Sequence, residues 1–184
     1  MDTRTRVGHI NRNIKIVAGP DAGWGYSVTV YGYRDTNNNL WTGSVQLSGV
    51  QFTDAGQLDT LNAPLRFLNS IGTTKSNVVD SSFVNCKANC IKIDNSKNIA
   101  LISNVLYSVW VVGIWVDQST DITISSNIIM GVKGRPTVSE GAELIACMAI
   151  VNYPDPLVDK VLVRDNFCQG STQHGYAFTM VKCD

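Results

Sequence analysis

The chain has 184 residues, enough for one domain with a buried core, and its formal net charge at pH 7 is zero. Hydrophobic residues make up 44% of the chain and charged residues only 16%, which is low for a globular domain. The balanced charge gives no electrostatic basis for binding nucleic acid or an anionic membrane, and no apolar run reaches the roughly 18 residues of a membrane-spanning helix.

Strand-like segments begin close to the N-terminus. The first ten residues, MDTRTRVGHI, are basic but lack the apolar run of a secretory signal. Residues 12–17 and 27–31 have the alternation of short strands, and residues 43–52 continue it with glycine at a corner. We therefore expect residues 1–184 to form a single domain that is a fragment or module of a larger chain.

A repeat further along the chain decides the predicted fold. Four similar segments each end in an apolar residue: Phe83, Val105, Ile128 and Phe167. The first three of these residues lie 22 and then 23 positions apart, and the fourth follows 39 positions later. Each ends a segment made of a short alternating strand and a polar corner: residues 77–83, 99–105, 122–128 and 161–167. The longer last step predicts a side loop inserted near residues 133–144.

A second strand follows these segments at a nearly constant offset, at residues 91–93, 114–116 and 176–178. Helices are excluded because their apolar residues would recur every 3.6 positions. Alternating strands that repeat at about 22 residues predict an all-β, right-handed parallel β-helix, in which neighbouring rungs bond at about 4.8 Å. A β-sandwich is the alternative, but it would not produce a constant period.

One polar corner position recurs along the repeat and predicts a structural ladder of side-chain hydrogen bonds. Asparagine suits such a corner because it adopts left-handed turn conformations readily. The position is occupied by Ser82, Asn104, Asn127 and Asn166.

Five cysteines allow at most two internal disulfides and leave one thiol over. Cys86 and Cys90 flank a tight corner, and Cys147 or Cys168 could meet Cys183, although the register does not settle the pairing. The chain has no CxxC pair and only two histidines, so we expect no zinc site. Disulfides would favour an oxidising compartment, with buried free thiols as the alternative.

Four outward positions form the candidate binding site. Asp94 and Asp117 occupy equivalent positions on adjacent rungs, where two carboxylates could cleave a glycosidic bond or hold calcium, or could simply cap turns. Trp115 is predicted to point outward, with Lys92 on the same stripe. There the indole could stack on a sugar or anchor a protein partner, unless the side loop covers it.

Four segments in the first half of the chain carry a family resemblance: VGHINRNIKI, DAGWGYSVTV, GSVQLSGVQFTDAGQ and NAPLRF. Their order resembles the β-helix region of fibrocystin and the fibrocystin-like surface proteins, and is similar to the related hyaluronan-depolymerising proteins. The tail DNFCQGSTQHGYAF resembles the rung that closes this region in the fibrocystin branch. The resemblance implies an extracellular surface protein in which the β-helix is one module of many.

The sequence departs from the hyaluronan-degrading branch at residues 63–69, APLRFLN, where that branch carries a histidine. We therefore expect a non-catalytic extracellular module for structure or adhesion, with no cofactor and no metal. The alternatives are a polysaccharide-cleaving enzyme that uses Asp94 and Asp117, and a polysaccharide-binding module that uses Trp115. Because a β-helix exposes strand edges at both ends, the expected partners are neighbouring domains or further copies in a filament, with glycans as additional ligands.

Overall fold

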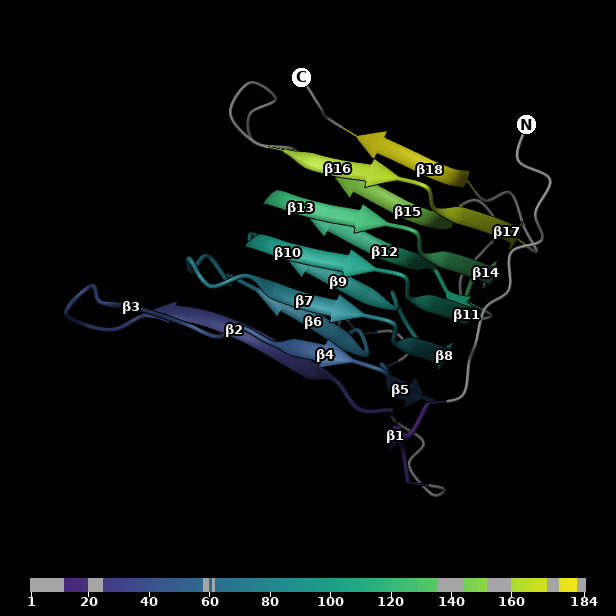
Figure 1. Ribbon diagram of the computed structural model, residues 1–184, viewed down its shortest axis with the longest axis horizontal. Coiled ribbons are helices and arrows are strands. Elements are labelled where there is room, and N and C mark those ends of the chain that lie inside the picture. Colours follow the sequence, from purple (N-terminus) through teal and green to yellow (C-terminus); the bar gives the residue numbers. More distant parts are fainter. Residues whose placement is uncertain are drawn as a thin grey trace.

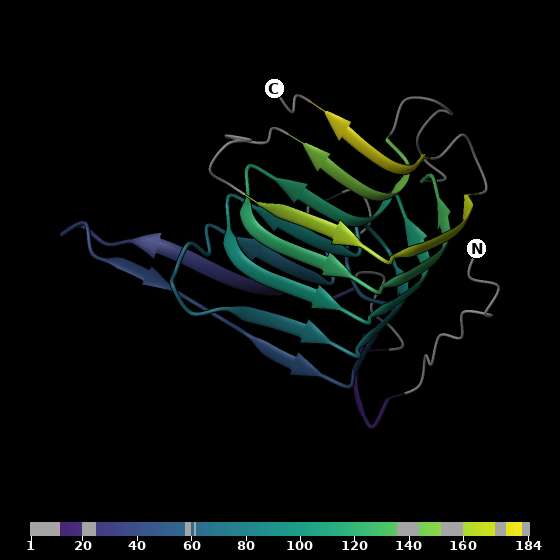
Figure 2. The same ribbon diagram turned by 45° about the horizontal axis from the view of Figure 1, so that its top comes forward.

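The computed structural model describes residues 12–19, 25–57, 60, 62–135, 144–151, 160–171 and 176–181. Within these residues the chain forms strands and turns without a helix, so no helix long and apolar enough to cross a membrane occurs there. Figure 1 shows the strands stacked into a coil, and Figure 2 shows how each turn of the chain lies on the one before it. The predicted all-β parallel β-helix is confirmed.

Three sheets run along the coil. The strands of sheet 1 are named from the N-terminal end of the stack, and those of sheets 2 and 3 from the C-terminal end. Sheet 1 consists of β1 (Ile14–Val17), β5 (Val50–Thr53), β8 (Ser82–Cys86), β11 (Val105–Trp110), β14 (Ile128–Lys133) and β17 (Phe167–Ser171). Sheet 2 consists of β16 (Val161–Arg164), β13 (Thr120–Ser125), β10 (Lys97–Ile102), β7 (Ser76–Val79) and β4 (Gln46–Ser48). Sheet 3 consists of β18 (Tyr176–Val181), β15 (Ala146–Val151), β12 (Val112–Asp117), β9 (Ile91–Asp94), β6 (Leu65–Leu68), β2 (Val28–Arg34) and β3 (Leu40–Thr42).

Each rung contains three strands, one from each sheet, where the sequence analysis expected two. The missed strands belong to sheet 1, which follows the polar corner directly and therefore looked like the end of the preceding segment. In the regular part of the coil the step between paired residues is 23 positions, as in the pair Ile91 and Ile114 or the pair Ile99 and Ile122.

The predicted alignment of the first copy of the repeat, residues 77–83, with the second copy is wrong by one residue. Val105 pairs with Ser82, and Leu106 pairs with Phe83, so Phe83 and Val105 are not equivalent. The two adjacent serines of this copy made both alignments possible. The backbone N–H of Ser81 donates to Asn104 Oδ1, which makes Ser81, and not Ser82, the ladder residue of this rung.

The extra residues of the last rungs are divided between two places, where the sequence analysis expected one side loop. Val112 pairs with Ala146, 34 positions on, which puts eleven extra residues before β15. Ile122 pairs with Val161, 39 positions on, so five more follow β15. The side loop near residues 133–144 is therefore only the larger of two insertions, and most of its residues lie outside the described part of the chain.

A ladder of buried amides runs through the corner between sheets 2 and 1. Asn104 Nδ2 donates to Asn127 Oδ1 at 3.0 Å, and Asn127 Nδ2 donates to Asn166 Oδ1 at 2.9 Å. Each of these oxygens also accepts a backbone N–H from the preceding rung, and each amide also donates to a strand carbonyl. Asn104 and Asn127 are fully buried, so the ladder satisfies polar groups that have no access to water.

The left-handed conformation expected of the ladder residues belongs instead to the residue before each of them. These residues have φ between 47° and 57°: Asp80, Ser103, Ser126 and Asp165. The kink at that position turns the next side chain into the interior, where its amide can stack on the amide of the neighbouring rung.

Both disulfides lie at the coil interior. Cys86 and Cys90 are joined across the corner between β8 and β9, and Cys147 in β15 is joined to Cys168 in β17. The expectation that Cys147 or Cys168 pairs with Cys183 is therefore wrong, because the two residues face each other across the interior from consecutive rungs. Cys183 lies outside the described residues.

The ladder gives the first testable prediction. Replacing Asn127 with alanine removes the acceptor of the Asn104 amide and the donor to Leu101 O, leaving buried polar groups unpaired. We expect the free energy of unfolding, measured by urea denaturation, to fall by about 3 kcal/mol. The control Asn77→Ala removes a solvent-exposed bond to Gln46 and should cost at most about 0.5 kcal/mol. Equal losses in the two variants would contradict a structural ladder.

Candidate functional site

The outward stripe of sheet 3 brings together the residues that could carry chemistry. The register aligns Arg66 of β6, Lys92 of β9 and Trp115 of β12 across three successive rungs. Two positions further along each strand, it aligns Asp94 with Asp117. The structure therefore places all four sequence-derived candidates on one face, and adds Arg66.

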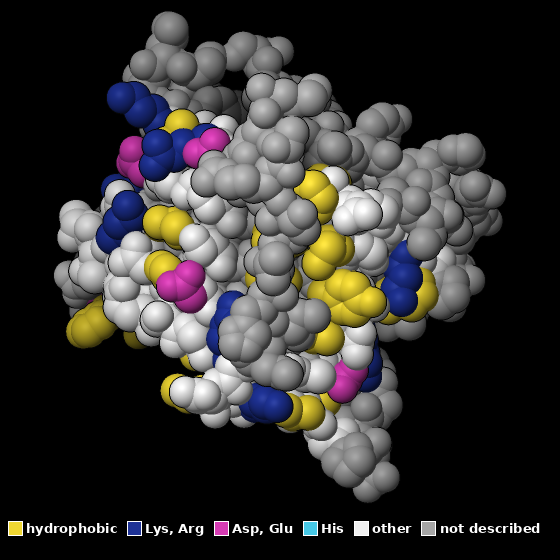
Figure 3. Space-filling model, turned by 45° about the vertical axis from the view of Figure 1, so that its right-hand side comes forward, with side chains coloured by type: hydrophobic (Ala, Val, Ile, Leu, Met, Phe, Trp, Pro, Cys, Tyr) yellow, Lys and Arg dark blue, Asp and Glu magenta, His cyan; other side chains and the backbone are white. Residues whose placement is uncertain are grey.

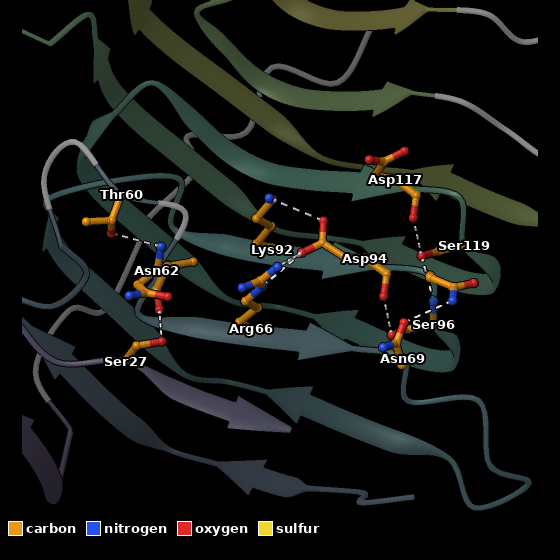
Figure 4. A network of polar contacts seen from close by, with 12 residues as sticks. Ser27, Thr60, Asn62, Arg66, Asn69, Lys92, Asp94, Ser96, Asp117 and Ser119 are labelled. Atoms are coloured by element: carbon orange, nitrogen blue, oxygen red, sulfur yellow. Dashed lines mark hydrogen bonds and ion pairs between the residues drawn. The ribbon is translucent and has the colours of Figure 1, made fainter. Parts of the chain in front are cut away.

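Asp94 lies between two cations. Its Oδ2 accepts from Arg66 Nε at 2.9 Å and lies 2.9 Å from Arg66 Nη2, while its Oδ1 lies 3.4 Å from Lys92 Nζ. Figure 4 shows both cationic side chains turned toward the Asp94 carboxylate. The three side chains are only 10–17% exposed, so we name Arg66, Lys92 and Asp94 the buried ion triad.

The triad is suited to structure more than to proton transfer. Cleavage of a glycosidic bond needs two carboxyl groups that can reach the substrate, whereas both carboxylate oxygens of Asp94 are engaged by Arg66 and Lys92. Asp117 is the partner of Asp94 in the register of the next rung. In the described part of the chain, no group of three or more His, Cys, Asp or Glu side chains could hold a metal ion.

A second ladder, of serines, closes the strand ends that carry the two aspartates. Ser96 Oγ donates to Asp94 O at 2.8 Å, and Ser119 Oγ donates to Asp117 O at 2.6 Å. Each hydroxyl also accepts a backbone N–H from the preceding rung, from Ser70 and Ser96 respectively. The turns after both aspartates are therefore capped by the serines that follow them, as Figure 4 shows.

Trp115 is an outward residue, but it is not an open platform. It packs with Val111 and Leu144 against a small apolar cluster formed by Val112, Ala146 and Ala149. Leu144 comes from the end of the side loop, so this residue of the loop packs on the same cluster as Trp115. Within the described residues the indole N–H is buried and has no hydrogen-bond partner.

Charges on the coil surface are of mixed sign. Figure 3 shows lysine, arginine and acidic side chains interspersed on the face that it displays, with hydrophobic side chains between them. One cation, Lys133, interacts with a ring on the neighbouring rung, because its Nζ lies 4.1 Å from the centre of the Trp110 ring.

Sequence reasoning missed Arg66 and the serine ladder. Arg66 and Lys92 are 26 positions apart, so the repeat of the later rungs does not align them. Ser96 and Ser119 are 23 positions apart, and this spacing could have revealed them. They were passed over because single serines are common in corners.

The buried ion triad gives the second prediction. A double-mutant cycle of Asp94→Ala with Arg66→Ala, followed by urea unfolding, should give a coupling energy of about 1.5–3 kcal/mol because the pair is desolvated. The matched cycle of Asp94→Ala with Lys92→Ala should give a smaller value, since Lys92 makes one longer contact. Couplings below about 0.5 kcal/mol in both cycles would show that the triad behaves as an exposed surface pair.

The sequence of the chain matches the model of a known family. The model of a family described as a right-handed beta helix region matches residues 24–153. No curated protein and no solved structure shows a significant match to the chain.

Proposed function

The chain belongs to the right-handed β-helix family, and on this premise we propose that it is a non-catalytic structural or adhesion module of an extracellular surface protein. Its working surfaces are the two ends of the coil. Neighbouring domains of a longer chain, or further copies of the same β-helix, cover these ends.

The observation that carries the proposal is the arrangement of the outermost strands. In the described part of the chain, β16, β17 and β18 each close one end of their sheet and pair with a strand on one side only. One rung of parallel strands therefore presents its outer backbone groups together. Such an edge is a template for pairing with a further strand, and a head-to-tail contact that does not close into a ring propagates.

Two further observations support an extracellular setting. Both disulfides join residues whose side chains line the coil interior, and disulfides persist in oxidising compartments. The segments that resemble the β-helix region of fibrocystin-like surface proteins cover the start of β2, all of β4 and β5, and most of β6, which pair in parallel within the coil. A fibrocystin-like surface protein is therefore the parent that we propose.

Polysaccharide cleavage at Asp94 is not supported by the geometry. The Asp94 carboxylate is held in the buried ion triad, and the end of its own strand is capped by Ser96. Trp115 is half-buried against the small apolar cluster and its indole N–H is buried, so it offers a sugar less surface than an open ring would.

The third prediction tests the end surfaces. Light scattering and electron microscopy of the purified chain should show filaments or end-to-end oligomers. Leu162→Lys, on the outer strand β16 where the side chain is 47% exposed, should abolish them because a lysine on an edge strand opposes pairing.

The matched control is Tyr107→Lys. Tyr107 is 44% exposed and lies on β11 in the middle of the coil, so assembly through the ends should survive its replacement. A monodisperse monomer for the unmodified chain would contradict assembly of copies. Loss of assembly in both variants would contradict the assignment to the coil ends.

A further inference from the structure

A hairpin formed by β2 and β3 extends sideways from the coil, as Figures 1 and 2 show. β2 and β3 pair antiparallel, whereas the other pairs of described strands are parallel, and Tyr33 lies opposite Trp41. Its base is anchored, because Val28 to Tyr31 pair with Leu65 to Leu68 of β6. The tip therefore stands clear of the coil while its base shares the coil's register.

The two faces of the hairpin differ in character. Val30 and Gly32 face the coil, and a Cβ at Gly32 would lie 2.0 Å from the carbonyl oxygen of Asn69, so only glycine fits this close approach. Because side chains alternate along a strand, Tyr31 and Tyr33 lie on the other face, where the cross-strand pairing also places Trp41. Tyr31, Tyr33 and Trp41, which are 50%, 50% and 56% exposed, form what we call the aromatic face.

The aromatic face is ordered in advance of any ligand. The rings of Tyr31 and Tyr33 are nearly parallel, with an interplanar angle of 11° and centroids 6.2 Å apart. Trp41 Nε1 donates to Asp35 Oδ2 at 3.1 Å, and Asp35 in turn accepts from the side chain and backbone of Asn39. The hydrogen bonds from the Asn39 side chain and the Trp41 indole lower the pKa of Asp35 to about 2, so this anchor is ionised at neutral pH.

The two charged side chains of the hairpin, Arg34 and Asp35, form hydrogen bonds with other residues of the hairpin. Asp35 holds Trp41 and Asn39, and Arg34 Nη1 donates to Asn38 O at 3.0 Å. What the hairpin itself adds around the three rings is neutral: amides at the tip and the hydroxyl of Thr29. The nearest charges on the adjoining strands, from Arg66, Lys92 and Asp94, are paired with one another in the buried ion triad. A nucleic acid would need cations free to meet its phosphates, and an acidic polysaccharide would need them for its carboxylates.

We infer that the aromatic face binds a neutral glycan chain. Tyrosine and tryptophan present large, rigid and amphipathic surfaces at low entropic cost, and their ring faces suit the C–H faces of pyranose rings. Rings repeated along a strand fit a ligand that is itself a repeat, and the surrounding amides and hydroxyls match sugar hydroxyl groups. This site is separate from the coil ends and does not depend on assembly through them.

The test uses the purified chain and titration calorimetry with cellohexaose and chitohexaose, which are soluble chains of β-1,4-linked neutral pyranoses. At least one should bind, and Trp41→Ala and Tyr33→Ala should each weaken that binding about tenfold or more, as truncation of a central aromatic anchor does. Trp41→Phe keeps the aromatic face without the bond to Asp35 and should retain most of the affinity. Tyr107→Ala, which removes a ring of similar exposure on β11, should leave it unchanged.

Circular dichroism and thermal unfolding establish that the variants are folded. Should Trp41→Ala unfold, Tyr33→Leu, which keeps an apolar strand residue without a ring, carries the test. The inference is overturned if neither oligosaccharide binds, if Tyr107→Ala weakens binding as much as Trp41→Ala, or if hyaluronan or single-stranded DNA binds better. It is also overturned if Trp41→Ala removes self-association of the chain in sedimentation and leaves glycan affinity unchanged, because the aromatic face would then be a protein contact.

Discussion

The stacking of side-chain amides inside the corner between sheets 2 and 1 fixes how one rung sits on the next. Asn104, Asn127 and Asn166 each link a neighbouring rung through both side-chain and backbone bonds. A shift of one residue would turn every inward side chain outward and leave buried amides unpaired. The register is therefore specified by polar groups, while the apolar interior, including the stacked rings of Phe52 and Phe83, contributes most of the buried area.

This constraint also determines what the outer surface can do. Because equivalent positions line up from rung to rung, Arg66 of β6 lies beside Lys92 of β9 and reaches Asp94, two positions further along β9. The alignment that brings these charges together also pairs them. Asp94, Arg66 and Lys92 are therefore engaged with one another and do not form an acid–base pair that is open to a substrate. The hairpin of β2 and β3, which departs from the regular coil, carries four of the eight large hydrophobic side chains that are exposed among the described residues: Tyr31, Tyr33, Leu40 and Trp41.

The fold could be predicted from the sequence because spacing alone distinguishes a coil of strands from helices. Asn104, Asn127 and Asn166 recur in one corner, and the structure shows the ladder that they imply. The assignment of Ser82 failed because serine neighbours serine there, and only the bond from Ser81 N to Asn104 Oδ1 distinguishes the two. Spacing could not reveal the pairing of Cys147 with Cys168, since it depends on which faces of sheets 3 and 1 meet across the interior.

The candidate site was less accessible to sequence reasoning for a related reason. Strand parity correctly put Lys92 and Trp115 on one outward stripe, but parity does not say what lies over a stripe. Trp115 packs with Leu144 against a common apolar cluster, and Arg66 enters from a rung whose length differs from the others. The rings of Tyr31, Tyr33 and Trp41 were not noticed, because their common face requires the antiparallel pairing of β2 and β3.

The Cys147–Cys168 disulfide has a mechanical consequence. A β-helix pulled from its C-terminal end would normally peel one strand at a time, since each rung is bonded only to its neighbours. Here a covalent bond joins β15 to β17 across a sequence separation of 21 residues. Tension applied beyond Cys168 is carried directly into β15, so β16 and the connection before it bear none of that load. The residues between the two cysteines therefore add no length when this end of the coil is pulled, and the load passes to the chain before Cys147.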